Sequence, residues 1–316
     1  MIITTIFDSL YLDKGLVMIE SLLKYNADIE IHALALDFKS FDVIKKLNFL
    51  KAYFVEDLEK NDEALLKAKN RNVKSELGEW YNLGERAYYC YTLTTYFTNY
   101  ILEANSHKSV LYCDADLLFY ESLESIKKEI GEKSCGLVSH RNTSAYFKYP
   151  AETGNYNVGI VFFKNNEIGI NISRFWKELM LNCKNQFSQT YGKCGDQKYL
   201  ELFEIIFGKE NVHEIEGEVA HGAPWNFEYY TFISDREIIY NLSKQKQRII
   251  FNHFSHFNIK QDKWLSAYKN EWNPETLNNY VFNFYENYHK EILEVRNKYN
   301  ITNESDCPYP LLKEET

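Results

Sequence analysis

The sequence has no C-x-x-C pair, no long apolar segment and no signal peptide, and each absence excludes a class of protein. The cysteines stand at positions 90, 113, 135, 183, 194 and 307, spacings that fit neither a zinc ribbon nor a thioredoxin-like motif. No run reaches the roughly 18 to 20 apolar residues of a membrane-spanning helix, and the N-terminus lacks a basic region followed by an apolar one. We therefore expect a cytoplasmic protein with reduced thiols. Peripheral contact with the inner membrane is left open.

Basic charge and flexible residues are also scarce. The net charge of −9 and the pI near 5.5 argue against a nucleic-acid-binding surface, which needs a basic face. The chain of 316 residues has 13 glycines and 5 prolines, whereas aromatic residues make up 16%. This composition is typical of a well-packed globular protein and not of a disordered one.

Two aspartates one residue apart, Asp114 and Asp116, follow a short apolar run at residues 110–113. Such a run predicts a strand buried on both faces, and ligands of α/β sheets bind where these strands end. Alternate residues of an extended segment point the same way, so both carboxylates can face one site while Ala115 turns away. A cation relieves their repulsion, and oxygen ligands suit Mg²⁺ or Mn²⁺ beside substrate phosphates. The pair therefore indicates a metal-diphosphate site, with a plain polar turn as the alternative.

Short β-rich runs alternate with stretches of helical spacing along most of the chain. Strands are expected at 2–7, 29–36, 52–55, 110–113, 135–139, 159–163 and 249–257, and helices at 15–23, 42–50, 85–103, 122–130, 172–181 and from 194. This alternation predicts the α/β class with a mostly parallel sheet. Residues 265–316 are interpreted as a C-terminal helical extension, with a helix from 274 to about 299, that packs on a catalytic domain of residues 1–264.

Several other short segments stand out. They are Thr5-Ile-Phe-Asp-Ser-Leu-Tyr11, Asn157-Val-Gly159, Gly195-Asp-Gln197, His221-Gly-Ala-Pro-Trp-Asn226 and His253-Phe-Ser-His-Phe257. Together with Asp114-Ala-Asp116, and in this order, they resemble the motifs of GT-A fold glycosyltransferases, more specifically the family 8-like nucleotide-diphospho-sugar transferases of bacteria. The resemblance covers about residues 1–264. It implies a Rossmann-like, mixed and mostly parallel sheet with flanking helices.

The resemblance also implies a set of residues that bind the nucleotide-sugar donor. They are Asp8, Tyr11, Arg86, Asp114, Ala115, Asp116, Asn157, Gly159 and Trp225. Asp8 and Tyr11 would contact the base and ribose, and Trp225 would stack on a sugar. Plainer roles fit the same residue types: Asp8 can start a helix, and the two aromatic side chains can simply pack.

The implied catalytic residues are Asp196, Gln197 and Asn157. Asp196 and Gln197 match the Asp-Gln pair that opens a helix beside the donor sugar, and Asp196 would bind a sugar hydroxyl or act on the acceptor side. Helix capping is the alternative for Asp196. Asn157 belongs to an N-x-G turn whose glycine permits a close backbone approach.

A histidine would complete the metal site with Asp114 and Asp116. His253 matches the first residue of the family's H-F-S-G-F segment and is the first choice. His256 stands at the usual glycine position, eight residues before Trp264, and is the second choice. An imidazole beside two carboxylates suits Mn²⁺ better than Mg²⁺, and the nitrogen that binds the metal must be neutral.

The resemblance implies a metal-dependent enzyme that moves a sugar, most simply from a UDP-sugar, to an acceptor hydroxyl in bacterial surface glycan synthesis, with retained anomeric configuration. The acceptor would be a glycan, a lipid-linked molecule or a protein. A sugar nucleotidyltransferase is one alternative, although residues 5–15 lack the glycine-rich phosphate loop usual in such enzymes. A non-catalytic carbohydrate-binding protein is the other.

Overall fold

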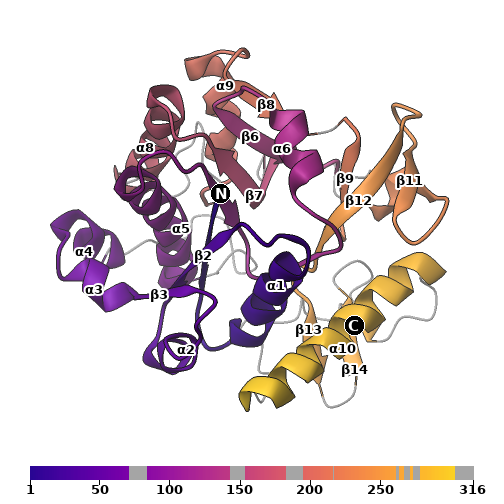
Figure 1. Cartoon of the computed structure of the whole chain (residues 1–316), viewed down its shortest axis with the longest axis horizontal. Helices are drawn as coiled ribbons and strands as arrows, with labels where there is room; N and C mark the ends of the chain where they lie inside the picture. The colour runs from indigo at the N-terminus through magenta and orange to yellow at the C-terminus, as the bar shows by residue number, and fades with distance from the viewer. Residues whose placement is uncertain are drawn as a thin grey trace.

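A computed structural model describes residues 1–70, 84–142, 154–182, 195–215, 217–260, 263–266, 271–272 and 278–302. At residues 84–88, 260, 266 and 271–272 it describes the backbone alone. The described part is an α/β structure with three sheets (Figure 1).

The central sheet has seven strands in the order β3-β2-β1-β4-β7-β6-β8. Their bounds are β1 Ile2–Phe7, β2 Glu30–Ala35, β3 Lys51–Phe54, β4 Val110–Cys113, β6 Cys135–Ser139, β7 Tyr156–Phe163 and β8 Val212–Glu214. Neighbouring strands are parallel except at β7, which runs antiparallel to both β4 and β6. The predicted mixed, mostly parallel sheet is therefore confirmed.

Helices cover both faces of this sheet. They are α1 Leu12–Tyr25, α2 Phe38–Ile44, α3 Val55–Glu59, α4 Glu63–Lys69, α5 Gly84–Ala104, α6 Glu124–Ile130, α8 Glu167–Asn182, α9 Glu201–Phe207 and α10 Asn279–Tyr299. Strand β1 shows why two layers form: Ile3 packs with α1 and α10, whereas Ile2 packs with α5 and α8. Successive side chains of a strand point to opposite faces, so a strand that is apolar throughout needs a cover on each side.

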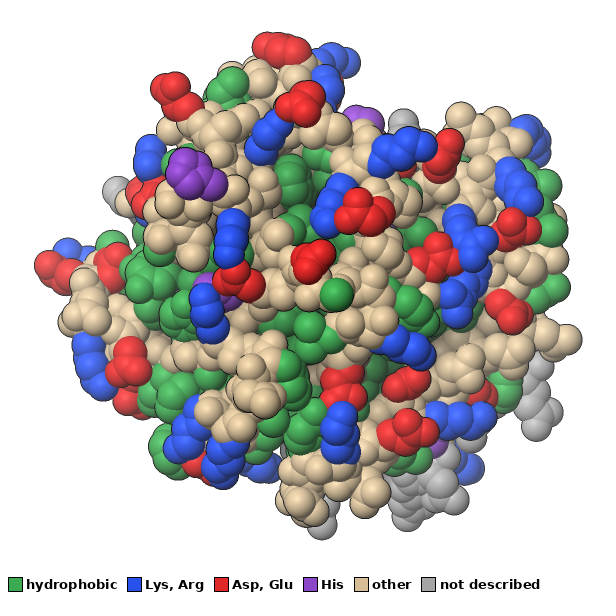
Figure 2. Space-filling model, viewed as in Figure 1, with side chains coloured by type: hydrophobic (Ala, Val, Ile, Leu, Met, Phe, Trp, Pro, Cys, Tyr) green, Lys and Arg blue, Asp and Glu red, His purple; other side chains and the backbone are tan. Residues whose placement is uncertain are grey.

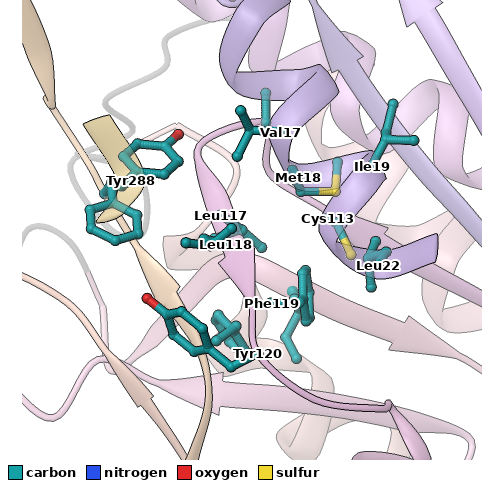
Figure 3. Close-up of a cluster of buried hydrophobic side chains, with 14 of the residues drawn as sticks. Val17, Met18, Ile19, Leu22, Cys113, Leu117, Leu118, Phe119, Tyr120 and Tyr288 are labelled. Carbon is teal, nitrogen blue, oxygen red and sulfur yellow. The ribbon is translucent and has the colours of Figure 1, made fainter. Parts of the chain in front are cut away.

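Directly after the two aspartates, the chain enters a second sheet. Strand β5 (Leu117–Phe119) leaves the central sheet and joins the order β10-β11-β12-β5, and β9 also pairs with β12. The bounds are β9 Val219–Gly222, β10 Tyr230–Phe232, β11 Glu237–Tyr240 and β12 Lys246–His253. Side chains of β5 and α1 meet in one buried cluster (Figure 3). The segment between β4 and β5 is thus anchored at both ends in the core.

The C-terminal part of the described chain packs beside α1. A small sheet of β13 (Asn258–Lys260), β14 (Lys263–Ser266) and β15 (Glu271–Trp272) precedes α10, and Figure 1 shows α10 at the opposite end of the molecule from α9. Asn278 caps α10 by accepting a hydrogen bond from the backbone N–H of Tyr280. The helix predicted from residue 274 therefore begins at 279; residues 273–277 lie outside the described part.

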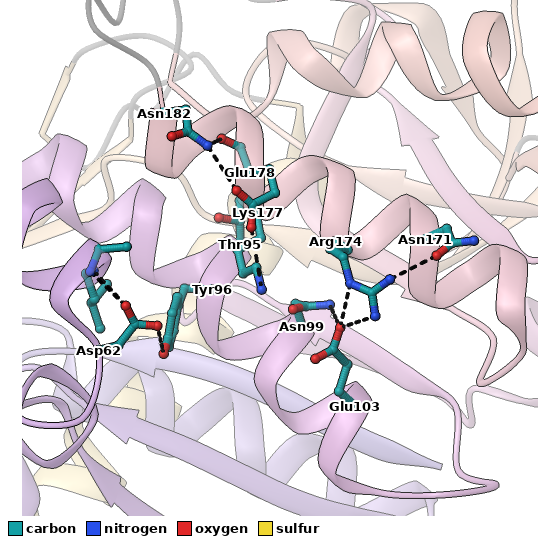
Figure 4. A network of polar contacts seen from close by, with 12 residues as sticks. Asp62, Thr95, Tyr96, Asn99, Glu103, Asn171, Arg174, Lys177, Glu178 and Asn182 are labelled. Atoms are coloured by element: carbon teal, nitrogen blue, oxygen red, sulfur yellow. Dashed lines mark hydrogen bonds and ion pairs between the residues drawn. The ribbon is translucent and has the colours of Figure 1, made fainter.

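Polar contacts join α4, α5 and α8 on the other face of the sheet (Figure 4). The Tyr96 hydroxyl donates to Asp62 at 2.8 Å, and the Arg174 guanidinium donates to Glu103 at 2.8 Å. Asp62 is the N-cap of α4, so its carboxylate ties the start of that helix to the middle of α5. These contacts tie α4 and α8 to α5, which packs on strands β1 and β4.

Three local predictions are wrong. Helix α2 begins at Phe38 and not at 42, because the Asp37 carboxylate accepts the Ser40 N–H and caps it. The turn expected around Asn157 is part of strand β7, which pairs with β6 across a register shift. The helix expected from 194 begins later, with a 3-10 turn at Lys198–Leu200 followed by α9.

The visible surface carries charges of both signs. Figure 2 shows Lys and Arg side chains interspersed with Asp and Glu over this face, without a field of one sign. This mixture is what a solvated surface shows, and a nucleic-acid-binding face needs a basic stripe instead. Among the described helices, none is long and apolar enough to cross a membrane.

Candidate functional site

Asp114, Asp116 and His253 meet where the two larger sheets join. Strand β5 pairs with β12 so that Leu117 lies opposite His253, which brings the end of β12 beside the Asp-Ala-Asp segment. The His253 Nε2 lies 3.1 Å from Asp116 Oδ1 and 3.7 Å from Asp114 Oδ2. One ligand atom from each residue lies within 4.8 Å of the others, and this is the group that could hold a metal ion among the described residues.

The site concentrates negative charge away from water. The Asp114 side chain is 30% exposed, yet the protein packed around it raises its pKa, His253 opposes that rise, and repulsion from Asp116 adds to it. Burial also disfavours the charged form of Asp116, but His253 holds the pKa of that carboxyl below its ordinary value. Burial disfavours a charged His253 as well, and the two carboxylates nevertheless raise its pKa. A positive ion between these groups would therefore be strongly favoured.

The other ring nitrogen of His253 is held by Asn157. His253 Nδ1 lies 3.1 Å from Asn157 Oδ1, which also accepts the Gly159 N–H at 2.7 Å. A Cβ on Gly159 would lie 2.6 Å from Asn157 Oδ1 and 2.8 Å from His253 Nδ1. Only glycine fits this contact, so the N-x-G segment supports the imidazole from strand β7.

His256 lies outside this metal-binding group. Its side chain is exposed and its φ is +58°, in the left-handed region where glycine is favoured. This conformation fits the glycine that the H-F-S-G-F segment, which residues 253–257 resemble, has at the position of His256. The structure thus brings His253, and not His256, into contact with both aspartates.

Asp196 and Gln197 lie on the neighbouring loop. Asp196 is 4% exposed, and its backbone oxygen accepts from the Trp176 indole at 2.9 Å. Burial raises its pKa well above the ordinary value, and the Asp114 charge adds to the shift. The Gln197 Oε1 lies 3.5 Å from the Asn157 amide nitrogen. The Gln197 side chain, at the N-cap position of the following 3-10 helix, makes no capping hydrogen bond.

Trp225 forms a wall of the site. Its ring centroid lies 5.2 Å from that of His253 and 5.4 Å from that of His140, each at a steep angle. The indole Nε1 is buried and has no partner within the described part of the chain. Trp225 therefore offers both an aromatic surface and a hydrogen-bond donor.

The two residues predicted to contact the base and ribose, Asp8 and Tyr11, follow strand β1. The Asp8 carboxylate accepts the N–H groups of Leu10 at 2.9 Å and Tyr11 at 3.2 Å, so it shapes the loop that enters α1. The Lys14 ammonium lies 4.2 Å from the centroid of the Tyr11 ring, and it donates to the Phe257 carbonyl at 2.8 Å. The backbone of Arg86 lies in α5, and its side chain is outside the described part.

Three contributors to the site were missed by sequence reasoning. The Tyr112 hydroxyl donates to Asp114 at 2.7 Å, and the Lys14 charge favours the ionised form of Asp116. His140, at the end of β6, contacts Asn157. Position alone offered a signal for Tyr112, which lies on β4 two residues before Asp114. No motif pointed to Lys14 or His140.

The donor set fits a divalent cation. Two carboxylates and one imidazole nitrogen are a combination that suits Mn²⁺, and the Asn157 contact orients the histidine as partners of metal-bound histidines do. Asp114, Asp116 and His253 would hold the ion.

No family profile matches the sequence. Two proteins of Bacillus subtilis (strain 168) are similar. Uncharacterized protein YfnD is 26% identical over 262 residues, 82% of this chain and 79% of that protein. Uncharacterized protein YfnF is 28% identical over 257 residues, 78% of each.

Among solved structures, the galactosyltransferase LgtC in complex with donor and acceptor sugar analogs matches with a TM-score of 0.54 and 13% identity, over 93% of this chain and 96% of that chain. An active-site mutant of LgtC matches with a TM-score of 0.51 and 13% identity, over 92% and 95%. At this identity the likeness shows the fold, which is the GT-A fold. The predicted fold class is confirmed.

Proposed function

We propose that this protein is a metal-dependent glycosyltransferase that moves a sugar from a nucleotide diphosphate to an acceptor hydroxyl. The observation that carries the proposal is the convergence of Asp114, Asp116 and His253 at the carboxyl end of β4, where ligands of α/β sheets bind. LgtC, which has the same fold, is a galactosyltransferase whose solved structure is a complex with donor and acceptor sugar analogs. A chain with this fold and this donor set has the parts that such a transfer needs.

The residues around the proposed metal have separate tasks. A bound ion would neutralise the charge that develops on the leaving diphosphate. Lys14 adds a second positive charge near the proposed ion, since its charge acts on Asp116. Asp196 would hydrogen-bond a sugar hydroxyl or act on the acceptor side, and the Trp225 ring would pack against the sugar. Asp8 and Tyr11 would hold the nucleoside at the end of β1.

The finer features rest on the family resemblance. We propose Mn²⁺ as the ion, a UDP-sugar as the donor and retention of the anomeric configuration. The acceptor would be a glycan, lipid-linked molecule or protein in bacterial surface polysaccharide synthesis. The same resemblance supports membership of family 8 and the division into residues 1–264 and 265–316. We also propose a cytoplasmic location with peripheral contact at the inner membrane.

The direct test is the release of nucleoside diphosphate. The full chain is incubated with a panel of sugar nucleotides and Mn²⁺, with and without EDTA, and the products are separated by ion-exchange chromatography. We expect nucleoside diphosphate from at least one donor, only when free Mn²⁺ is present. A nucleotidyltransferase would instead form a sugar nucleotide from a sugar phosphate. Absence of release, together with unchanged thermal stability in every mixture, would count against any enzyme of this class.

The two histidines give a matched comparison. His253→Ala removes a nitrogen that lies 3.1 Å from Asp116, whereas His256→Ala removes an exposed ring outside the group. We expect the first variant to weaken Mn²⁺ binding by at least about a hundredfold and the second by less than about threefold, since the loss of supporting partners alone costs ~10 to 100-fold. Titration with Mn²⁺, followed by the electron paramagnetic resonance signal of the free ion, measures both. The reverse order would assign the ligand to His256.

A further inference from the structure

We propose that His140 is a positioning residue for the metal site: through Asn157 it holds His253 with a hydrogen on Nδ1 and with Nε2 facing Asp114 and Asp116. Nothing in the motifs of the sequence pointed to this residue. The inference deepens the proposed function and rests on it in one respect, that the three-residue group binds a divalent ion.

The first contact fixes the proton on His140. Its ring is 5% exposed at the end of β6, and Nδ1 lies 3.1 Å from the backbone oxygen of Gly154. A carbonyl oxygen can only accept, so Nδ1 must carry the hydrogen and donate. Burial lowers the pKa of His140 to about 4, and the ring is therefore neutral near pH 7. Its Nε2 is then a hydrogen-bond acceptor.

The second contact fixes the orientation of the Asn157 amide. The His140 Nε2 lies 3.3 Å from Asn157 Nδ2, which has hydrogens to donate. The Gly159 N–H points at the other end of the amide at 2.7 Å, and an N–H needs an oxygen there. Two independent partners thus demand the same orientation, with Nδ2 toward His140 and Oδ1 toward the metal site.

The third contact fixes His253. Asn157 Oδ1 lies 3.1 Å from His253 Nδ1 and, as an oxygen, it requires a hydrogen on that nitrogen. When His253 binds a metal its ring must be neutral, and the lone pair is then on Nε2, the atom 3.1 Å from Asp116 and 3.7 Å from Asp114. Each hydrogen bond in the series is therefore donated in the same direction: His253 donates to Asn157, Asn157 to His140, and His140 to the Gly154 oxygen. The Nε2 of His253 is left to bind a metal.

Packing keeps this series of contacts in place. Asn157 and His140 are both 5% exposed, and the Trp225 ring lies against both imidazoles. If His140 lost its acceptor, the partner left to Asn157 Nδ2 within the described part of the chain would be Gln197, at the long distance of 3.5 Å. A buried amide donor without a good partner is unfavourable, so the side chain would shift and His253 would lose its fixed orientation.

The test compares two nearly isosteric variants, His140→Gln and His140→Met. Both lose the ring, but only the glutamine has an oxygen that can accept from Asn157 Nδ2. The probe is Mn²⁺ alone, titrated into each full-length protein and followed by electron paramagnetic resonance, with urea unfolding measured in parallel. We expect the methionine variant to bind Mn²⁺ about tenfold or more weakly, in the range of ~10 to 100-fold for partners of metal-bound histidines, and the glutamine variant to bind within about threefold of the unaltered protein.

Two further variants separate positioning from loss of stability. His140→Asn keeps a donor for Gly154 but is too short to reach Asn157, so it must bind Mn²⁺ as weakly as the methionine variant; it also replaces that variant if the latter fails to fold. His32→Leu removes a histidine that is 1% exposed on β2 and contacts Tyr53, and it must leave Mn²⁺ binding unchanged.

The possible outcomes distinguish the inference from the function on which it rests. Normal Mn²⁺ binding by the methionine and asparagine variants would overturn the role of His140 and leave the proposed transferase intact. Equal losses in the glutamine and methionine variants would also overturn it, because the ring would then act by packing alone. Absence of Mn²⁺ binding by the unaltered protein would overturn the metal site itself.

Discussion

Asp116→Asn is expected to slow the Mn²⁺-dependent release of nucleoside diphosphate by about 10³-fold while the chain stays folded. The substitution keeps the size of the side chain and removes the charge that His253 contacts at 3.1 Å. Metal ions stabilise transition-state charge by several kcal/mol, and a loss of about 4 kcal/mol corresponds to roughly 10³ in rate. The backbone oxygen of Asp116 still accepts the Phe254 N–H at 2.9 Å, so the join between the two sheets is preserved.

The matched control is Asp57→Asn. It makes the same chemical change on an exposed carboxylate of α3, paired with Lys60, and should leave the rate unchanged. Initial rates at saturating Mn²⁺ and the urea midpoint are measured for both variants. If Asp116→Asn keeps a rate within about threefold of the unaltered protein, the carboxylate does not hold a catalytic metal. A lower urea midpoint together with the lower rate would instead indicate a folding defect.

Local sequence signals predicted the elements that this site occupies. The apolar run before Asp114 predicted a buried central strand, and the structure has β4 at Val110–Cys113. A strand was also predicted at 249–257, and β12 covers Lys246–His253, so it ends four residues earlier than predicted. At β4 the signal was a continuous apolar run on a strand covered on two faces, and such a signal depends only on neighbouring residues.

The pairings that build the site were not predictable from local patterns. The apolar run after Asp116 looks like a continuation of β4, yet β5 joins a second sheet by pairing with a strand more than a hundred residues later. Asn157 was assigned to a turn because Asn and Gly favour turns, whereas pairing with β6 and β4 makes this segment a strand. Such long-range contacts override local propensity.

The roles of His140 and Lys14 were missed for a related reason. Each depends on a partner that only the fold supplies: Asn157 for His140, and the Phe257 carbonyl for Lys14. A lone buried histidine or a lysine in the first turn of a helix has no sequence context that reveals such a partner. The motifs of the resemblance therefore indicated the predicted site residues, but not the residues that support them.

Arg296→Met is expected to lower the free energy of unfolding by about 3 to 5 kcal/mol, the usual cost of leaving one charge of a buried pair without its partner. Arg296, in the last turns of α10, contacts the Asp13 carboxylate at 2.6 Å, and the Asp13 side chain is only 1% exposed. Asp13 lies between Tyr11 and Lys14 on the first turn of α1. The ion pair therefore connects the C-terminal helix to the turn that carries Lys14 and follows Tyr11 of the proposed nucleotide site.

Lys298→Met is the matched control, since Lys298 pairs with Glu20 on the same two helices but is 59% exposed. Exposed pairs contribute about 0 to 1 kcal/mol, so equilibrium urea unfolding should separate the two variants by at least about 2 kcal/mol. The double variant Arg296→Met with Asp13→Asn removes both charges and is expected to recover part of the loss. Equal, small effects of the two single variants would mean that apolar packing, and not this ion pair, holds α10 against α1.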